Sequence, residues 1–340
     1  MSDAPFIDLL ARVRGGIHLT RDEMRGAFER IMTGQVAEDD LAEFLRALAT
    51  KGETVEEIAG AADIMNEKVT RVPCDADCVD TCGTGGDGIS TFNVSTTAAI
   101  IAAGAGAIVA KHGNRTTTRV SGSAEAIAAL GVNLDADVPV LGRCLRECGI
   151  AFLYAPRLHP AMKYAAPARK RLGIRTIFNL LGPLTNPAGA RRQILGTCRP
   201  DLADKLAQVL ALRNATFAWV ACGGDGLCDL TITGPTHIAE VRGGATRLFT
   251  LHPGDFGLET APLESLLVDS PQASADAIRA ILSGQDRGPR RSHALLNAAA
   301  VLHVADRADS LEAGLALAAE AVDSGAALAK IQQLAAVSRS

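Results

Sequence analysis

The sequence predicts an α/β protein whose mostly parallel central sheet is flanked by helices and preceded by a small all-helical domain. Residues 1 to about 70 carry apolar side chains at helical spacing without a strand pattern. From about residue 75, short β-branched or apolar runs alternate with Ala- and Leu-rich segments, which is typical of a parallel sheet covered on both faces. We therefore expect two domains, 1–72 and 73–340, and a large core, since 48% of the 340 residues are hydrophobic.

The first domain should contain four helices. Apolar residues recur three or four positions apart in each of four segments: 7–13, 24–32, 41–48 and 55–65. Two Thr-x-x-Glu sequences have the spacing of capping boxes at the starts of the second and fourth helices: Thr20 with Glu23, and Thr54 with Glu57. The apolar faces exceed what four short helices need for one another. They predict packing on the rest of the chain or on a second subunit, and we expect a homodimer.

The second domain should alternate strands and helices. Strands are expected at Cys78–Thr81, Ala107–Ala110, Ala151–Tyr154, Thr176–Phe178, Gln193–Thr197, Phe217–Cys222 and Arg247–Leu251. After about residue 270 the pattern is helical again, with helices at Ser274–Leu282, Ser292–Val304, Leu311–Ala321 and Ala326–Val337. Ligands of such sheets bind outside the carboxyl ends of the strands, so we expect the binding site in the segments that follow the strands.

A glycine-rich segment, CGTGGDG at 82–88, follows the first expected strand. Glycine tolerates positive φ and lets backbone N–H groups approach a ligand closely, and concave arrays of such groups hold phosphate oxygens. The segment also matches the dinucleotide pattern G-x-G-x-x-G, which requires an acidic residue about 20 positions later. The next acid after Asp87 is Glu125. We therefore reject NAD binding.

Two further segments suit a phosphate ligand. Residues 93–96, NVST, stand where an Ala- and Ile-rich helix begins, so the free N–H groups of its first turn can hold an anion. Residues 111–115, KHGNR, directly follow an expected buried strand and include two cationic side chains. The chain has a net charge of −4, yet no acid occurs from Gly88 through Ala124, and three bases fall in this window: Lys111, Arg115 and Arg119. This imbalance favours an organic pyrophosphate as ligand.

Other features exclude several classes of protein. The eight cysteines include C-x3-C spacings at 74–82 and 144–148, not the C-x2-C of a zinc site, and we interpret them as small apolar side chains. No apolar run reaches the roughly 18 residues that span a bilayer. The first ten residues lack a basic region ahead of an apolar stretch. We expect a cytoplasmic protein without a membrane partner.

Four motifs, taken together, resemble those of the anthranilate phosphoribosyltransferase family. They are GTGGDG, NVST, KHGNR and, at 173–187, GIRTIFNLLGPLTNP, and they occur in the family's order and spacing over nearly the whole chain. The resemblance implies the fold shared by nucleoside phosphorylases and phosphoribosyltransferases. It also implies transfer of the phosphoribosyl group of phosphoribosyl pyrophosphate to the amino group of anthranilate, a step of tryptophan biosynthesis that uses Mg²⁺.

The resemblance assigns residues to each ligand. Phosphoribosyl pyrophosphate would be bound by Gly83, Gly86, Asp87, Thr91, Asn93, Val94, Ser95, Thr96, Lys111, His112, Gly113, Asn114, Arg115 and Ser123. Anthranilate would contact Gly83, Asn114 and Arg169, and Ser95 and Asp229 would bind magnesium. Arg169 belongs to a helix expected over 159–171. No catalytic nucleophile or base is assigned, because pyrophosphate departs when Mg²⁺, cations and N–H groups absorb its charge.

Two segments depart from the family's pattern. Residues 116–120, TTTRV, place Arg119 and Val120 where the family has a serine and a base. At 228–229 the family has adjacent Asp and Glu as magnesium ligands, whereas this chain has Cys228 and the shorter Asp229. Because Mg²⁺ demands hard oxygen ligands, we expect a weakened metal site near Asp229.

The sequence is a poorer match to two alternative functions. A pyrimidine-nucleoside phosphorylase has a similar fold, but GTGGDG, NVST and an intact GIRTIFNLLGPLTNP argue against it. A non-catalytic relative that binds nucleic acid should be basic, and a net charge of −4 is a poor match. We expect no nucleic-acid partner.

Overall fold

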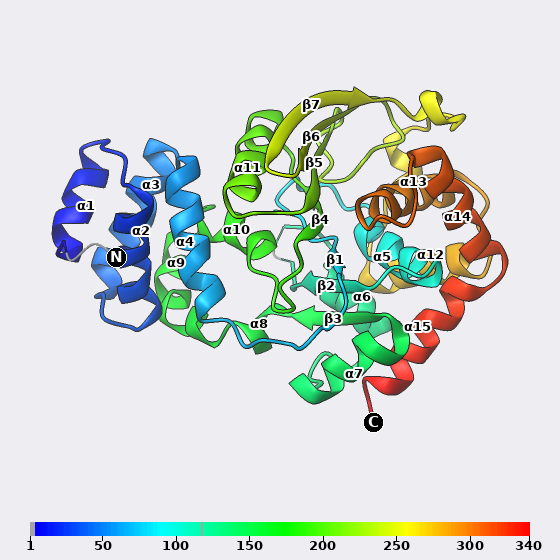
Figure 1. The fold of residues 1–340 in the computed structure, drawn as a ribbon, viewed down its shortest axis with the longest axis horizontal. Helices are drawn as coiled ribbons and strands as arrows, with labels where there is room; N and C mark the ends of the chain where they lie inside the picture. Colours follow the sequence, from blue (N-terminus) through cyan, green and yellow to red (C-terminus); the bar gives the residue numbers. More distant parts are fainter. Residues whose placement is uncertain (1–3, 117) are drawn as a thin grey trace.

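The structure is a computed structural model, and it describes residues 4–116 and 118–340. Figure 1 shows an elongated molecule with the first four helices at one end, the sheet in the middle and the last helices at the other end. Thr117, from the TTTRV segment, lies outside the described residues. Among the described helices, none combines the length and the apolar character that crossing a bilayer requires.

The N-terminal helices form as the apolar spacing predicts. They are α1 (Phe6–Arg14), α2 (Arg21–Met32), α3 (Glu38–Lys51) and α4 (Val55–Glu67). The capping boxes at Thr20 and Thr54 are both present, with each threonine accepting a hydrogen bond from the glutamate N–H and each glutamate accepting one from the threonine N–H. These reciprocal bonds satisfy N–H groups that the first helical turn leaves without partners.

The sheet contains seven strands within the described residues. They are β1 (Val79–Asp80), β2 (Val109–Gly113), β3 (Ile150–Tyr154), β4 (Arg192–Gly196), β5 (Phe217–Gly223), β6 (Thr236–Arg242) and β7 (Ala245–Leu251). Their order is β3-β2-β1-β4-β5-β6-β7, with β1 to β5 parallel and the last two added antiparallel. The mostly parallel sheet predicted from the sequence is confirmed.

Helices cover the sheet. The α-helices of this part are α5 (Val94–Gly104), α6 (Ser123–Ala129), α7 (Val138–Cys148), α8 (Ala155–Leu158), α9 (Ala166–Leu172), α10 (Phe178–Leu181), α11 (Pro200–Leu212), α12 (Pro271–Leu282), α13 (Pro289–Val304), α14 (Leu311–Asp323) and α15 (Ala326–Val337). Short 3₁₀ turns are η1 (Pro160–Tyr164), η2 (Gly182–Leu184), η3 (Pro253–Phe256) and η4 (Leu263–Leu266).

Each face of the sheet has its own hydrophobic cluster, and β5 illustrates how one strand serves both. Phe217, Trp219 and Ala221 join the cluster that contains α5 and α13. The alternate residues, such as Val220, join the cluster of α1–α4 with α9–α11. Successive side chains of a strand point to opposite faces, so one buried strand supplies two cores. The N-terminal helices therefore pack on the same cluster as part of the α/β sheet.

The structure differs from the predicted secondary structure in three places. Residues 176–178 are not a strand: α10 begins at Phe178, and the Thr176 N–H donates to the side chain of Asn179, which turns the chain. Strand β6 was not predicted, although Gly243-Gly244, both at positive φ, connects it to β7 as a tight hairpin. The helix expected over 159–171 is divided into η1 and α9, because Pro167 lies in the first turn of α9 and cannot donate the hydrogen bond that would continue the preceding turn.

Candidate functional site

The glycine-rich segment lies at the carboxyl edge of the sheet, against the end of β4. The Thr84 N–H donates to the Gly196 carbonyl at 2.8 Å. A Cβ at Gly83 would lie 2.9 Å from that same oxygen, so only glycine fits there. Gly85 and Gly86 have φ values of 59° and 87°, which side chains rarely adopt. The predicted sharp turn is therefore present, and its conformation depends on these glycines.

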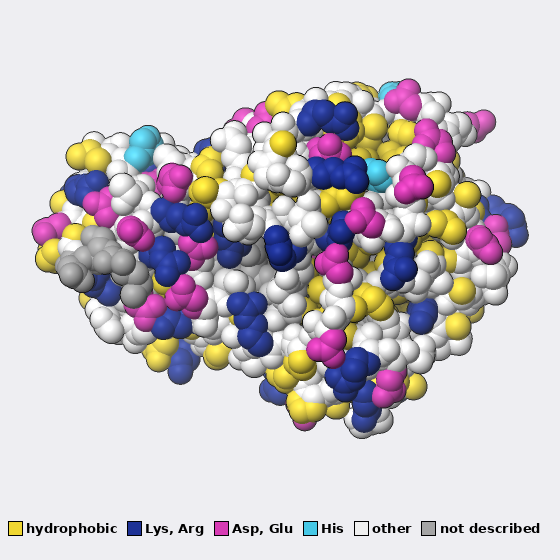
Figure 2. Space-filling model, viewed as in Figure 1, with side chains coloured by type: hydrophobic (Ala, Val, Ile, Leu, Met, Phe, Trp, Pro, Cys, Tyr) yellow, Lys and Arg dark blue, Asp and Glu magenta, His cyan; other side chains and the backbone are white. Residues whose placement is uncertain are grey.

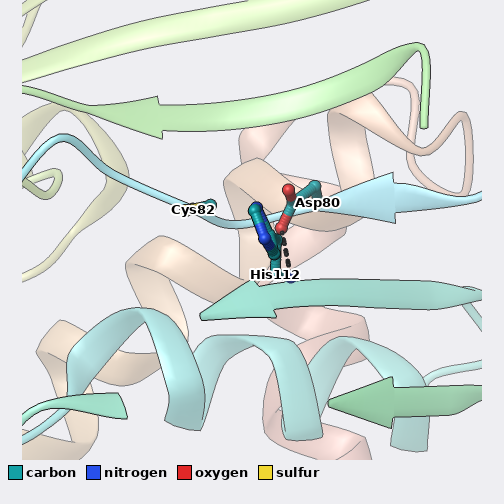
Figure 3. Close-up of side chains that lie close together, drawn as sticks. All are labelled: Asp80, Cys82 and His112. Carbon is teal, nitrogen blue, oxygen red and sulfur yellow. Dashed lines mark hydrogen bonds between the residues drawn. The ribbon is translucent and has the colours of Figure 1, made fainter. Parts of the chain in front are cut away.

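Asp80, at the end of β1, ties three segments of the site together. Its carboxylate accepts hydrogen bonds from the N–H groups of Thr81 and His112 and from the side chain of Asn186, at 2.7, 3.0 and 2.8 Å. Figure 3 shows Asp80 and His112 on the neighbouring strands β1 and β2. Burial raises the pKa of Asp80 to about 6, although Asn186 and the positive charge of Lys111 act in the opposite direction.

The hydrogen bonds of His112 define its protonation. Its Nδ1 lies 3.0 Å from the Gly182 carbonyl, which only accepts, so Nδ1 carries the proton. Its Nε2 then accepts a hydrogen bond from Nε2 of His159 at 3.1 Å. Burial lowers the pKa of His112 to about 3 and that of His159 to about 4. Both imidazoles are neutral near pH 7, and this pairing makes His112 a structural residue of the site.

Asp80, Cys82 and His112 are close enough to suggest a metal centre, since one potential ligand atom of each lies within 4.8 Å of the others. The Asp80 carboxylate and the His112 ring are already hydrogen-bonded within the protein. Burial also raises the pKa of the Cys82 thiol, which opposes the thiolate that a metal needs. These contacts make the cluster a structural junction instead of a metal site.

Lys111 is the buried cation of the site. Its Nζ donates to the Thr81 hydroxyl at 2.9 Å and lies 3.4 Å from the Ser95 hydroxyl. Burial lowers the pKa of its ammonium group. Lys111 is only 2% exposed, and no carboxylate forms a salt bridge to it within the described residues. Such a cation can absorb negative charge from a ligand that enters beside Ser95.

The start of α5 presents N–H groups that no side chain caps. Asn93 occupies the N-cap position, but its side chain instead bonds Ser121 and Ser274. In this structure the free backbone N–H groups and Ser95 are available to an anion, whereas the Asn93 amide is engaged within the protein. Val94 is buried in the core. The hydroxyls of Thr91 and Thr96 are also buried, and neither has a hydrogen-bond partner among the described residues.

The two residues expected to bind magnesium line the same small cavity. Ser95 and Asp229 both line it, together with Thr81 and Cys228, and its volume is about 10 Å³, enough for roughly one water molecule or ion. Asp229 is 8% exposed, and no hydrogen bond to its carboxylate forms within residues 4–116 and 118–340. Burial raises its pKa to about 6, although Arg119 and Lys111 act to lower it.

Asp87 is engaged by the protein itself. The Arg119 guanidinium donates two hydrogen bonds to the Asp87 carboxylate, one from Nε at 2.6 Å and one from Nη2. The backbone N–H of Cys228 also donates to Asp87 at 3.3 Å, so the glycine-rich loop touches the loop that follows β5. The Asp87 side chain is completely buried. Its negative charge is therefore neutralised by Arg119 before any ligand arrives.

The outer residues of the predicted site cluster around the end of β2. Gly113 leaves no room for a Cβ between the Phe152 ring and the Ser123 hydroxyl. Ser123 in turn donates to the Asn114 carbonyl at 3.3 Å. Asn114 and Arg115 are exposed, and Arg115 donates to the Tyr154 hydroxyl. These residues can reach a ligand only from the solvent side.

Arg169 lies on α9 and is half-buried without an acidic partner. Its guanidinium stands over the Phe178 ring, 5.2 Å from the ring centroid. Burial lowers its pKa, and no carboxylate pairs with it in the part of the chain that the structure describes. A guanidinium stacked on a ring and left without a counter-charge is suited to an aromatic acid.

Two family profiles match the chain. Residues 7–69 match a profile described as "Glycosyl transferase family, helical bundle domain", and residues 75–328 match "Glycosyl transferase family, a/b domain". The anthranilate phosphoribosyltransferase of Chloroflexus aggregans is 49% identical over 333 residues, which cover 98% of each chain. That of Rhodospirillum rubrum is 48% identical and covers 97% of this chain and 94% of the relative. The chain belongs to the anthranilate phosphoribosyltransferase family.

Solved structures of this family have the same fold. Anthranilate phosphoribosyltransferase from Thermus thermophilus aligns with a TM-score of 0.92 and 37% identity, covering 97% of this chain and 99% of that one. The enzyme from Saccharomyces cerevisiae in complex with PRPP and Mg aligns with a TM-score of 0.90 and 28% identity, covering 99% of each chain. The expected family and fold are thus confirmed.

Arg175 is a site residue that the sequence reasoning missed, although it lies within the family motif GIRTIFNLLGPLTNP. Its Nη1 donates to the Gly85 carbonyl at 2.7 Å, and its guanidinium fills the space where a Cβ of Gly86 would stand. Arg175 therefore joins the segment after α9 to the glycine-rich loop. Nothing in its local sequence indicates that contact, because the two segments are 90 residues apart.

Proposed function

We propose that this chain transfers the phosphoribosyl group of phosphoribosyl pyrophosphate to the amino group of anthranilate, giving N-(5-phosphoribosyl)anthranilate and pyrophosphate. One observation carries the proposal: Arg169 is half-buried without an acidic partner among the described residues, in a chain whose sheet also has a carboxyl edge suited to phosphate. Arg175 connects the two regions, because it follows α9 and contacts the glycine-rich loop. An aromatic acid and a pyrophosphate are the ligands that these two regions suit.

The residues assigned to phosphoribosyl pyrophosphate divide into two groups by what they offer. Lys111 and the uncapped start of α5 present a cationic group and N–H groups beside Ser95, which lines the cavity. The second group, Asn93, His112 and Gly113, makes contacts inside the protein that hold the binding segments in place. The reaction needs charge absorbed on departing pyrophosphate, so positioning and electrostatics supply the catalysis. No side chain need form a covalent bond with the sugar.

Anthranilate is proposed to bind with its carboxylate on Arg169, and with Gly83 and Asn114 beside it. The planar guanidinium can make two parallel hydrogen bonds to a carboxylate. The Phe178 ring holds the guanidinium from its other side. The amino group of anthranilate is then the nucleophile: its C–N bond to the anomeric carbon forms as the C–O bond to pyrophosphate breaks. The proton that the nitrogen loses passes to the released pyrophosphate or to water.

Mg²⁺ is proposed as the cofactor, bound at Ser95 mainly through the pyrophosphate of the substrate. The Ser95 hydroxyl lines the cavity at 3.4 Å from Lys111, and oxygen is the ligand atom that Mg²⁺ prefers. When bound, the ion withdraws negative charge from pyrophosphate. A further ion near Asp229 fits poorly, because Asp87 is occupied by Arg119 and Cys228 offers a thiol.

Replacing Cys228 by aspartate tests that second position. Cys228→Asp adds a carboxylate beside Asp229 and should strengthen metal binding there, so that the rate depends on Mg²⁺ concentration differently from the wild-type rate. Cys228→Ser, which adds no charge, is the control and should leave the dependence as it is. The dependence is measured by titrating Mg²⁺ in the activity assay. An unchanged curve for Cys228→Asp would show that this pair is not a metal site.

The proposed activity is tested by following the loss of anthranilate fluorescence with phosphoribosyl pyrophosphate and Mg²⁺. Fluorescence should fall only when both are present, and chromatography should show pyrophosphate released in equal amount.

The alternative phosphorylase activity is tested with uridine or thymidine and phosphate. Binding to nucleic acid is the less favoured alternative, since Figure 2 shows basic and acidic side chains intermixed on the visible face. A gel shift at low salt checks it.

We also propose a homodimer built through the N-terminal helices. Ile7 on α1 and Ile17 after it are 57% and 52% exposed, although most apolar residues of α1–α4 are buried within the chain. Light scattering at micromolar concentration should give twice the mass of one chain. Ile7→Asp with Ile17→Asp should yield monomers, whereas Leu248→Asp, an equally exposed apolar site on β7, should not. A wild-type monomer would contradict the proposal.

The division at residues 72 and 73 and the cytoplasmic location also stay proposals. Two separate family profiles, at 7–69 and 75–328, support the division. All eight cysteines are free, which fits a reducing compartment.

A further inference from the structure

The acidic groups at the pyrophosphate end pose a problem of charge. The Asp87 side chain is completely buried, and Asp229 is 8% exposed. The loops that carry them touch through the hydrogen bond from the Cys228 N–H to Asp87. Two buried carboxylates beside a pyrophosphate would repel the substrate unless a cation stands with them.

Arg119 supplies that cation from within the chain. Its guanidinium binds Asp87 with Nε and Nη2, and Asp87 also accepts a hydrogen bond from the N–H of Cys228, the residue next to Asp229. Burial raises the pKa of Asp229, and the charge of Arg119 acts in the opposite direction. The remaining nitrogen, Nη1, makes no hydrogen bond to the described residues. The Arg119 side chain is 15% exposed, so it is not sealed inside the protein.

We propose that Arg119 is a built-in cation of the pyrophosphate site: it neutralises Asp87 and Asp229, keeps divalent ions away from them, and presents Nη1 to the leaving pyrophosphate. This inference rests on the proposed function, because it names how one end of that substrate is held. Arginine suits the role because its fork can bind a carboxylate on one edge and phosphate oxygens on the other. It also keeps its charge at every pH that the protein survives.

Metal binding without substrate gives the first test. Free Mn²⁺ is measured by electron paramagnetic resonance during titration of the wild type, Arg119→Gln, Arg119→Lys and Arg115→Gln. Arg119→Gln should gain about one bound Mn²⁺ per chain, because Asp87 loses its paired cation and Asp229 loses one of the two cations, Arg119 and Lys111, that act on it. Arg119→Lys keeps the charge and should gain none. Arg115→Gln removes the same charge from the same loop, but Arg115 bonds Tyr154 and no carboxylate, so it should also gain none.

Two further variants locate the ion and guard against misfolding. Asp229→Asn in the Arg119→Gln background should remove the gained ion. Asp229→Asn alone should leave wild-type Mn²⁺ binding unchanged, which tests the proposal even if Arg119→Gln does not fold. Circular dichroism melting identifies variants that fail to fold. The inference is overturned if Arg119→Gln binds no more Mn²⁺ than the wild type, or if Asp229→Asn alone removes a bound ion.

Binding of inorganic pyrophosphate, measured by calorimetry, gives the second test. Without a divalent ion, Arg119→Gln should bind pyrophosphate about 10- to 150-fold more weakly than the wild type, as expected for hydrogen bonds to a charged group. Added Mn²⁺ should restore much of this loss. Equal affinity in the two proteins would overturn the role of Nη1. Neither test uses anthranilate, so wild-type enzyme that turns over anthranilate would keep the proposed function even if Arg119 failed both tests.

Discussion

Replacing Arg169 by alanine is expected to weaken anthranilate binding about 30- to 5,000-fold, which corresponds to roughly 2–5 kcal/mol, while phosphoribosyl pyrophosphate binding changes little. The guanidinium is half-buried on Phe178 and has no acidic partner in the described protein, so a ligand carboxylate there would lose its only counter-charge. A carboxylate left unpaired in such a place keeps the full cost of its desolvation.

Two variants make the result specific. Arg169→Lys keeps the charge but loses the planar fork, and its loss should lie between those of the wild type and Arg169→Ala. Lys170→Ala removes a charge from the next residue of α9, which is exposed, and should have little effect. Calorimetry with each substrate separately measures the two affinities. Equal losses for both substrates would mean that Arg169 does not bind the acid.

Replacing Asp80 by alanine is expected to lower the free energy of unfolding by about 3–5 kcal/mol, because three buried donors lose their shared acceptor at roughly 1–3 kcal/mol each. These donors are the N–H groups of Thr81 and His112 and the side-chain amide of Asn186. Asp77→Ala is the matched control. Asp77 is an exposed carboxylate paired with Arg192, so its loss should cost no more than about 1 kcal/mol.

The effect of Asp80 should also depend on pH. Its pKa is about 6 in the folded chain and about 3.9 in an unfolded one, so between these values the folded state binds more protons. Stability from this group is therefore greatest below about pH 4, falls as the pH rises to about 6, and is constant above. The alanine variant lacks this dependence. Urea unfolding should show a larger difference between the two proteins at pH 5 than at pH 8, and a difference that grows with pH would contradict the assignment.

The local features of this protein were predictable from sequence because short-range chemistry decides them. Thr20 and Thr54 begin helices through contacts made within three residues. The glycine-rich turn depends on φ values that few other residues adopt. The acid-free window and the four motifs indicated a pyrophosphate site and the family, and the alternation of runs indicated a parallel sheet.

Prediction failed where one local pattern allowed two structures. Residues 176–178 are β-branched or aromatic and suggest a strand, yet the side chain of Asn179 caps a turn there. Strand β6 was missed because its alternation is interrupted by polar residues, although the Gly243-Gly244 turn was a usable indication. Local propensity is weak, and the packing of the finished sheet overrides it.

The sequence by itself determined the fold class, the helix starts and the chemical kind of the ligand. Only the tertiary structure decided the partners of the site's charges. Arg119 reaches Asp87 across 32 residues, and Asn186 reaches Asp80 across 106. The sequence shows Arg119 merely as one of three bases in an acid-free window. Its pairing depends on which loops the order of the strands brings to one edge, and spacing along the chain does not encode that order, because contacts between distant segments are selected by the burial of the whole core.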